Sequence, residues 1–234
     1  MSQKVCVVAG VGPGIGKACC ELYASKGYQV IMLARQQSFL DEMLQSLTNN
    51  ARGITIDLTQ EKAVNALFED LHKQYGAIDI LIYNAARGSF GSFLEVDPGE
   101  LEKNFAINTM GLLYCARAVA PTMIAREQGA IMVTGNTAAT RGGAKFATFA
   151  PSKSAARSLS QSMARELGPK KVHVSYLVID AAVDGPFARK LRTGESDDYF
   201  IQPGAIADAI WYLESQPQDC WTFEMDLRPH RENW

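Results

Sequence analysis

The 234-residue sequence lacks the residue spacings that build metal sites or disulfide frameworks. Its five cysteines are odd in number, fall mostly inside apolar stretches, and form neither a C-x-x-C pair nor a cysteine/histidine ligand spacing. The three histidines are scattered in the same way. Buried free thiols are therefore expected, and no metal site is predicted.

The sequence also lacks a long apolar run and a dominant charge. No stretch of about eighteen apolar residues predicts a membrane span, and a net charge of −2 gives no broad basic surface for nucleic acid. Residues 1–4 lead directly into an apolar run, which leaves no room for a signal peptide, so a cytoplasmic location is expected. With 47% hydrophobic residues, the chain suits one globular domain over residues 1–234.

Apolar runs alternate with amphipathic stretches almost to the end of the chain, which is typical of helices that cross over a parallel sheet. We expect a Rossmann-type, doubly wound parallel sheet of about seven strands with helices on both faces. The predicted strands cover residues 5–9, 29–34, 53–56, 78–83, 130–134, 172–178 and 221–227. The predicted helices include 17–24, 97–126, 152–167 and 205–213.

Capping residues predict where two of the helices begin. Thr59 is expected to cap a helix that runs through Leu71. Asp97 followed by Pro98 predicts the start of the long helix, with a kink near Pro121. The least patterned stretch, residues 184–200, is a candidate lid over a site.

A glycine-rich turn lies between the first strand and the first helix. Its glycines, Gly10, Gly14 and Gly16, have the spacing G-x-x-x-G-x-G, while Ile15 stands where the G-x-G-x-x-G fingerprint would need its third glycine. A strand, a glycine turn and a helix in this order point unpaired N–H groups and the positive end of the helix dipole at a phosphate. A nucleotide cofactor is predicted, with a tight turn that binds nothing as the alternative.

This turn resembles that of the short-chain dehydrogenase/reductase family. The resemblance implies contacts from Asp57 and Leu58 to the adenine and a cofactor role for Asn84, which follow the third and fourth strands. At the end of the second strand, Arg35 stands where a carboxylate would hold the ribose of NAD. A guanidinium grips a phosphate bidentately, so NADP(H) is the predicted cofactor, although Arg35 by itself could be a surface charge.

The resemblance extends to the reacting centre, but two catalytic positions differ from the family. Asn108 matches an asparagine that helps to hold a water, and Lys153 matches the lysine that holds the ribose. Phe149 stands where the proton-donating tyrosine is usual, and Asn136 stands at the serine position. The usual proton donor is absent, although the amide of Asn136 can still polarise a carbonyl.

Charged residues near the expected centre offer further hypotheses. Asp180 or Asp184 could replace the missing acid if burial raised its pKa, or the substrate could supply its own proton; otherwise these aspartates cap or solvate a loop. Arg87 stands where the family has glycine, and is either a site for an anionic substrate or a surface residue.

The sequence therefore predicts an atypical NADP(H)-dependent oxidoreductase that acts on a small carbonyl, alcohol or activated alkene. The alternative is a catalytically silent NADP(H)-binding protein that regulates or binds a partner; a scaffold that has lost nucleotide binding is less compatible with the retained residues. The resemblance implies a homodimer or homotetramer joined through the long helix and the Lys153 helix. The apolar residues 111–115 are consistent with such an interface, but also with the core.

Overall fold

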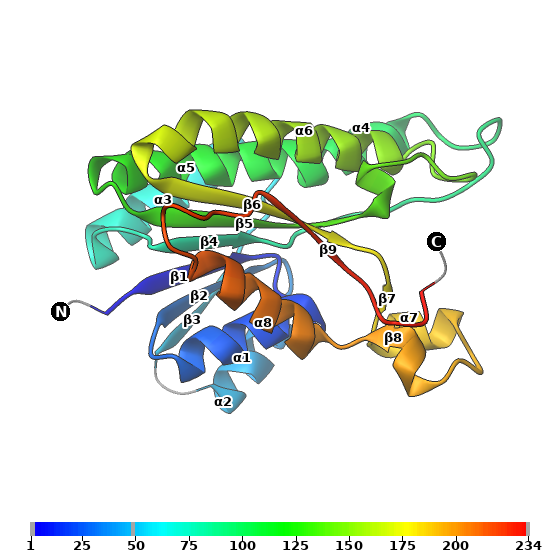
Figure 1. Ribbon diagram of the computed structural model, residues 1–234, viewed down its shortest axis with the longest axis horizontal. Helices are drawn as coiled ribbons and strands as arrows, with labels where there is room; N and C mark the ends of the chain where they lie inside the picture. The colour runs from blue at the N-terminus through cyan, green and yellow to red at the C-terminus, as the bar shows by residue number, and fades with distance from the viewer. Residues whose placement is uncertain (1–2, 48–49, 233–234) are drawn as a thin grey trace.

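The computed structural model describes residues 3–47 and 50–232. Within these residues, seven strands form one parallel sheet in the order β3-β2-β1-β4-β5-β6-β9 (Figure 1). The strands are β1 (Val5–Ala9), β2 (Gln29–Ala34), β3 (Ala51–Thr55), β4 (Ile80–Tyr83), β5 (Gly129–Asn136), β6 (Val172–Ile179) and β9 (Glu224–Leu227). The prediction of a parallel sheet of about seven strands is confirmed.

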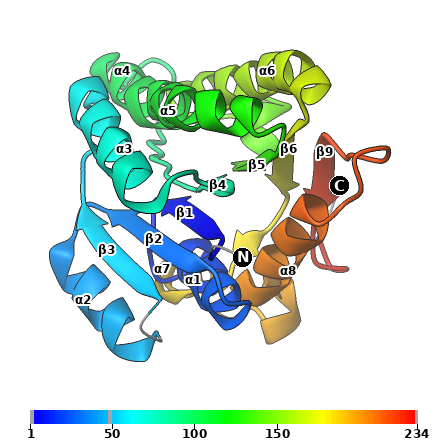
Figure 2. The same cartoon turned by 90° about the vertical axis from the view of Figure 1, so that its left-hand side faces the viewer.

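Helices cover both faces of the sheet (Figure 2). One face carries α1 (Ile15–Ser25), α2 (Gln37–Ser46) and α8 (Pro203–Glu214), and the other carries α3 (Glu61–Tyr75), α4 (Gly99–Phe105), α5 (Gly111–Ala125) and α6 (Ala150–Leu167). A separate core cluster fills each side of the sheet, and strands β1, β4 and β6 are buried along their whole length. This double coverage explains why the strands are continuous apolar runs.

Strands β2 and β3 are added on one side of β1, whereas β4 and the later strands of the sheet are added on its other side. The predicted site lies at this change in the strand order. The two strands are paired, with Val7 opposite Leu81. Helices that follow adjacent strands on opposite faces leave a crevice beyond the carboxyl ends of those strands. Gly10 follows β1 and Asn84 follows β4, so the predicted cofactor residues lie at this crevice.

The long helix expected over residues 97–126 is interrupted. Helix α4 ends at Phe105, a π-helical turn covers Ala106–Met110, and α5 begins at Gly111. A π turn shifts the backbone hydrogen bonds, and the Tyr83 hydroxyl donates a hydrogen bond to the Ile107 carbonyl within it. A Cβ on Gly111 would lie 2.4 Å from that hydroxyl, so a glycine is required beside it.

The predicted cap of α3 is wrong. The helix begins at Glu61, and Gln60 rather than Thr59 precedes it. The Thr59 hydroxyl instead donates a hydrogen bond of 2.8 Å to Asp57. A carboxylate is a strong hydrogen-bond acceptor, so the Thr59 hydroxyl binds Asp57 and does not cap α3. No side chain caps the start of this helix.

The candidate lid, residues 184–200, has a structure of its own. It contains α7 (Pro186–Leu191) and lies between two short paired strands, β7 (Ala182–Val183) and β8 (Phe200–Ile201). The sequence did not predict these strands because each is only two residues long.

The apolar stretch from Gly111 to Cys115 mostly faces inward. Gly111, Leu112 and Cys115 are buried, and the last two belong to the core cluster beside α3 and α6. The stretch therefore packs within the chain and gives no argument for an interface. In the described part of the chain, no helix has the length and apolarity needed to span a membrane.

Candidate active site

The glycine turn is shaped by a close approach between two strand ends. Gly10 has φ of +97°, and a Cβ there would lie 2.3 Å from the backbone nitrogen of Ala85. A Cβ on Gly16 would lie 2.8 Å from the carbonyl oxygen of Gly10. Only glycine fits at these two positions, because the chain itself occupies the space that a side chain would need.

Gly14 differs from the other two glycines. A Cβ on Gly14 would meet only the Cγ1 atom of Val183, at 4.0 Å. The chain therefore leaves space for a side chain there, whereas a ligand that approaches the backbone closely would need that space. Among the described residues, the N–H groups of Ile15 and Gly16 have no backbone acceptor, and no side chain caps α1. The turn thus offers free donors and open space, which fit a phosphate group.

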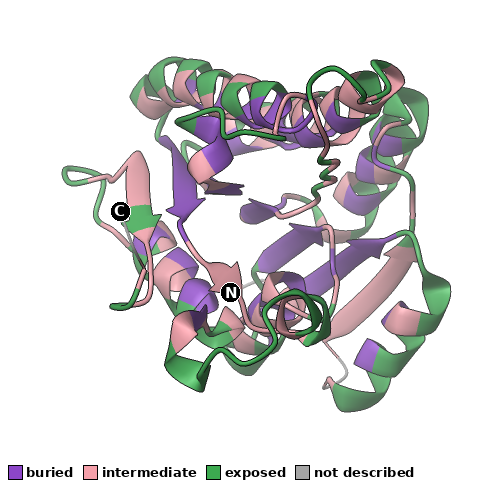
Figure 3. Ribbon diagram, turned by 90° about the vertical axis from the view of Figure 1, so that its right-hand side faces the viewer, coloured by how far each residue is buried: buried purple, intermediate pink, exposed green. Residues whose placement is uncertain are grey.

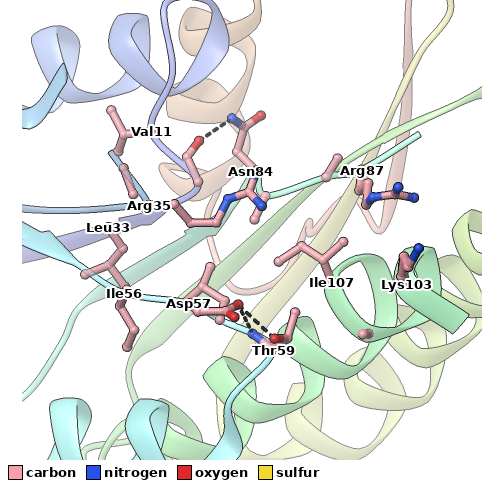
Figure 4. A pocket seen from close by; sticks show the side chains of 16 residues that line it. Val11, Leu33, Arg35, Ile56, Asp57, Thr59, Asn84, Arg87, Lys103 and Ile107 are labelled. Atoms are coloured by element: carbon pink, nitrogen blue, oxygen red, sulfur yellow. Dashed lines mark hydrogen bonds between the residues drawn. The ribbon is translucent and has the colours of Figure 1, made fainter. Parts of the chain in front are cut away.

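A cavity of about 490 Å³ lies beside this turn (Figure 4). Five of the predicted cofactor residues line it, namely Gly10, Arg35, Asp57, Leu58 and Asn84. The remaining residues predicted for cofactor binding or catalysis lie outside its lining. They are Gly14, Ile15, Gly16, Asn108, Asn136, Phe149 and Lys153. The cavity thus corresponds to one part of the predicted site, the part expected to hold the adenosine.

Asp57 is held as an ionised carboxylate at the cavity wall. Its Oδ1 accepts hydrogen bonds from the backbone N–H of Thr59 at 3.0 Å and from the Thr59 hydroxyl at 2.8 Å (Figure 4). These bonds, the backbone one foremost, lower the pKa of Asp57. The Arg35 guanidinium also favours the ionised form. Leu58, the next residue along the cavity wall, is buried.

A chain of hydrogen bonds joins the glycine turn to Lys153. Asn84 donates from Nδ2 to the Gly10 carbonyl at 2.8 Å and accepts at Oδ1 from the Thr134 hydroxyl at 2.9 Å. The Thr134 carbonyl in turn accepts a hydrogen bond of 3.2 Å from Lys153 Nζ. The chain crosses the ends of β1, β4 and β5, so it fixes the predicted cofactor turn relative to the predicted reacting centre.

Lys153 is an almost fully buried ammonium group. It lies in the first turn of α6, with 4% of the residue exposed, and the carbonyl of Thr134 is its hydrogen-bond acceptor. Burial disfavours the charged form and lowers the pKa of Lys153 to about 8. This ammonium group can therefore release a proton near neutral pH.

Asn108 fastens the β4 end to the Lys153 helix. It lies in the π-helical turn, and its Oδ1 accepts from the Arg87 backbone N–H at 2.9 Å. Its Nδ2 donates to the Arg87 carbonyl at 2.9 Å and to Ser152 Oγ at 2.8 Å. Because Ser152 precedes Lys153 directly, these bonds position the lysine through the helix backbone.

Phe149 occupies the residue before α6, one helical turn before Lys153. Its ring is 6% exposed and packs against Phe90 and Phe146, with ring centroids 5.3 and 6.2 Å away. Aromatic packing of this kind gives the predicted reacting centre an apolar wall. No proton can come from this position.

Asn136 ends β5, and its side-chain amide is not used by the fold. Its Oδ1 is buried without a hydrogen-bond partner among the described residues. A buried polar atom left without a partner costs roughly 1–3 kcal/mol and is typical of functional positions. This oxygen is an acceptor, so it remains available to a donor group of a ligand that enters the site.

The structure excludes Asp184 as a replacement acid. Its carboxylate accepts hydrogen bonds from Arg189 at 2.6 and 3.0 Å and from Gln202 at 3.0 Å. These bonds lower the pKa of Asp184 to about 2, whereas a general acid needs a raised pKa. Asp180 is 7% exposed and lies 4.0 Å from Arg141 and 3.9 Å from Arg228, so two guanidinium groups neutralise it.

Arg87 and Lys103 bring positive charge to the cavity wall. The Arg87 guanidinium donates to Glu100 at 2.6 Å and to Asn104 at 2.8 Å, which means that it is already paired inside the chain. Lys103 also pairs with Glu100, at 2.9 Å, and lines the same cavity. The sequence analysis missed Lys103, because a surface lysine three residues after a glutamate is an ordinary helix pair.

Known proteins resemble this chain over almost its full length. A family model described as short chain dehydrogenase matches residues 4–196. An uncharacterized oxidoreductase of Staphylococcus saprophyticus is 28% identical over 233 residues, which cover 98% of each chain. The crystal structure of a short-chain dehydrogenase from Rhodopseudomonas palustris is 30% identical, with a TM-score of 0.84 over 97% of this chain and 99% of that chain.

A second solved structure adds a bound cofactor to the comparison. A metagenomic short-chain oxidoreductase, solved in complex with NADP, is 28% identical to this chain, with a TM-score of 0.84 over 97% of both chains. The match of the family model to most of the sequence, together with the parallel sheet and its glycine turn, identifies the family. The chain belongs to the short-chain dehydrogenase family of oxidoreductases.

Proposed function

We propose that the protein is an atypical NADP(H)-dependent oxidoreductase that acts on a small carbonyl, alcohol or activated alkene. The observation that carries this proposal is the hydrogen-bond chain from Gly10 through Asn84 and Thr134 to Lys153. It connects the cofactor turn to a buried ammonium group, and a protein with no use for a reacting centre gains little from burying that charge. The NADP complex of the metagenomic relative supports the choice of cofactor.

Most of the predicted residues contact the cofactor or the substrate in this proposal. The backbone of Gly10, Gly14, Ile15 and Gly16 receives the phosphates, and Asp57 with Leu58 borders the adenine. Arg35 lies exposed at the end of β2 and pairs with the phosphate that distinguishes NADP from NAD. NADPH supplies a hydride when bound, Lys153 Nζ holds the ribose beside it, and the Asn136 amide polarises the substrate oxygen.

The cofactor assignment predicts the effect of reversing the charge at residue 35. Arg35→Glu is expected to raise the Kd of NADPH by roughly 10- to 100-fold, because a charge-assisted phosphate contact is replaced by repulsion. The Kd of NADH should change less than threefold, since NADH has no phosphate there. Fluorescence titration with both cofactors measures this. Arg165→Glu, an exposed substitution near the end of α6, is the matched control, and equal losses for both cofactors would contradict the assignment.

We infer that Lys153 supplies the proton that Phe149 cannot. Its Nζ atom releases a proton toward the substrate oxygen and is then reprotonated from solvent. A pKa of about 8 is close to the pH at which an acid catalyst works best. Of the acids considered from sequence, Asp184 stays ionised, with a pKa of about 2, and Asp180 faces two arginines.

This role predicts a pH dependence. Reduction needs the ammonium form, so kcat/KM for reduction should be constant below pH 8 and fall about tenfold per unit above it, as one proton is lost. Lys153→Arg keeps the positive charge up to pH 10, but its guanidinium is too weak an acid to release a proton, so the overall rate should drop and the fall above pH 8 should vanish. The Kd of NADPH, measured at the same pH values, separates cofactor binding from proton transfer. A wild-type rate that stays level to pH 10 would refute the assignment.

One observation favours the alternative, a catalytically silent NADP(H)-binding protein that acts as a regulator or binds a partner. Phe149 is packed into an aromatic cluster, as expected for a side chain with only a structural purpose. NADPH binding without NADPH oxidation on any carbonyl would support this alternative.

For either function, we expect a cytoplasmic homodimer or homotetramer formed through α5 and α6, as the family resemblance implies.

A further inference from the structure

A fully buried asparagine on α4 lies beside the candidate active site. Asn104 is 0% exposed, and the sequence analysis did not single it out. Its Nδ2 donates hydrogen bonds to Ser89 Oγ at 2.8 Å and to the Thr148 carbonyl at 2.6 Å. Its Oδ1 accepts a hydrogen bond of 2.8 Å from the Arg87 guanidinium. Both N–H groups and the oxygen of this amide are therefore paired inside the chain.

Asn104 and Asn108 hold the start of α6 at two points. The two asparagines are four residues apart in the chain, and their partners Thr148 and Ser152 are also four residues apart. Helix α4 and the π-helical turn both contact α6. Figure 3 views this end of the molecule, where exposed loops surround the buried ends of the strands. Asn108 thus holds α6 at Ser152, whereas Asn104 holds the residue directly before Phe149.

The polar character of the Asn104 contact is informative. An apolar side chain could fill the same buried space, whereas a buried amide costs free energy unless all of its polar groups are paired. A fully paired network fixes one geometry, because hydrogen bonds are directional and apolar packing is less so. The Thr148 hydroxyl adds a bond of 3.0 Å to the Ser89 carbonyl, so the residue before Phe149 is held through its side chain as well as its backbone.

Arg87 joins this network to the cavity beside the glycine turn. It lines that cavity, and its guanidinium bridges Asn104 and Glu100 at 2.8 and 2.6 Å. Its backbone N–H and carbonyl both bind Asn108, at 2.9 Å each. The arginine that stands where the family has glycine therefore connects the cavity wall to the start of α6 by way of Asn104.

We propose that Asn104, held by Arg87, is a positioning residue for Lys153. It fixes Thr148, and with it the first turn of α6, relative to the cavity that is proposed to hold the cofactor. The inference rests on the proposed function, because the Lys153 ammonium group needs an exact position only if it acts on a bound substrate. Displacing a reacting group by about 1 Å can lower a rate about 100-fold.

The first test replaces the amide by an apolar side chain of similar size. Asn104→Leu should lower kcat for NADPH oxidation by roughly 10- to 100-fold, with 2,3-butanedione as the carbonyl substrate, and change the KM for NADPH less than about threefold. Amide hydrogen exchange of residues 148–153 in the NADP+ complex should become at least about tenfold faster. Asn65→Leu, at an exposed position on α3, is the matched control and should change neither quantity.

The second test approaches the network from Arg87, whose side chain is half-buried, so these variants should fold even if Asn104→Leu does not. At saturating NADPH, Arg87→Met should lower kcat, and Arg87→Lys should keep most of it because a cationic donor remains. Combining Arg87→Met with Asn104→Leu should lower kcat less than about threefold beyond Asn104→Leu alone, since both substitutions break one network.

The outcomes separate this inference from the proposed function. Hydrogen exchange requires no turnover, so faster exchange confined to residues 148–153 supports the inference even if the protein oxidises no NADPH and the proposed reductase activity fails. Unchanged exchange in Asn104→Leu overturns the inference. A lower urea midpoint with kcat unchanged for the folded variant also overturns it, because Asn104 would then serve only stability. The same is true if Arg87→Lys loses as much activity as Arg87→Met.

Discussion

Phe149→Tyr is expected to increase the rate of NADPH-dependent carbonyl reduction by roughly 10²- to 10⁴-fold, the usual contribution of a positioned general acid. The variant restores a hydroxyl one helical turn before Lys153, in a backbone position that α6 already fixes. The nearby ammonium group would favour the ionised phenol and lower the pKa of the new tyrosine. Initial rates of NADPH oxidation at saturating cofactor measure the effect.

Two controls make the result specific to the hydroxyl group. Phe149→Leu keeps an apolar side chain that has no acidic proton, so it should give no increase in the rate of NADPH oxidation. Phe149→Tyr combined with Lys153→Met should lose most of the gain, because the phenol no longer has a cation beside it. A folded Phe149→Tyr variant that binds NADPH as tightly as the wild type, yet reduces no carbonyl faster, would show that proton transfer does not limit this protein.

Gly10→Ala should destabilise the fold, whereas Gly14→Ala should leave its stability almost unchanged. At Gly10 the φ of +97° and the contact of 2.3 Å with Ala85 both exclude a side chain. The paired strands β1 and β4 cannot move apart to relieve it. Strain and overpacking together should lower the free energy of unfolding by roughly 2–5 kcal/mol. Urea denaturation measures this loss.

At Gly14 a Cβ would reach only Val183, at 4.0 Å, so Gly14→Ala should unfold at nearly the wild-type urea concentration. It should nevertheless weaken NADPH binding by at least about tenfold, if the ligand occupies the space that the methyl group would take. Gly168→Ala, directly after α6, is the control, because a Cβ there also meets nothing within 4 Å and the residue lies outside the glycine turn. NADPH binding as tight as that of the wild type in the Gly14→Ala variant would mean that the phosphates lie elsewhere.

The sequence predicted features that depend on local patterns. Continuous apolar runs gave most strand positions within a few residues, and the spacing of Gly10, Gly14 and Gly16 gave the turn. The sequence alone also shows that residue 149 is a phenylalanine, which has no hydroxyl group. Predictions failed where two short-range preferences competed. Thr59 can cap a helix or bind a nearby carboxylate, and Asp57, two residues before it, decided the outcome.

The hypothesis that Asp184 replaces the missing acid failed for a different reason. A raised pKa at Asp184 required a water-poor site without cations, and the sequence does not show which groups surround a loop residue. Arg189 lies five residues further on, on α7, and Gln202 lies eighteen residues further on, where the parallel pairing of β7 with β8 brings it to the carboxylate. The structure therefore assigns Asp184 to anchoring the candidate lid.

By itself, the sequence predicted the parallel sheet and its glycine turn, because both follow from patterns of residues that lie close together in the chain. Only the tertiary structure decided how Gly10, Asn84, Thr134 and Lys153 connect. Asn84 lies 74 residues from Gly10 and 50 from Thr134. Such contacts depend on the order of the strands across the sheet, which places β1, β4 and β5 side by side and aligns their carboxyl ends.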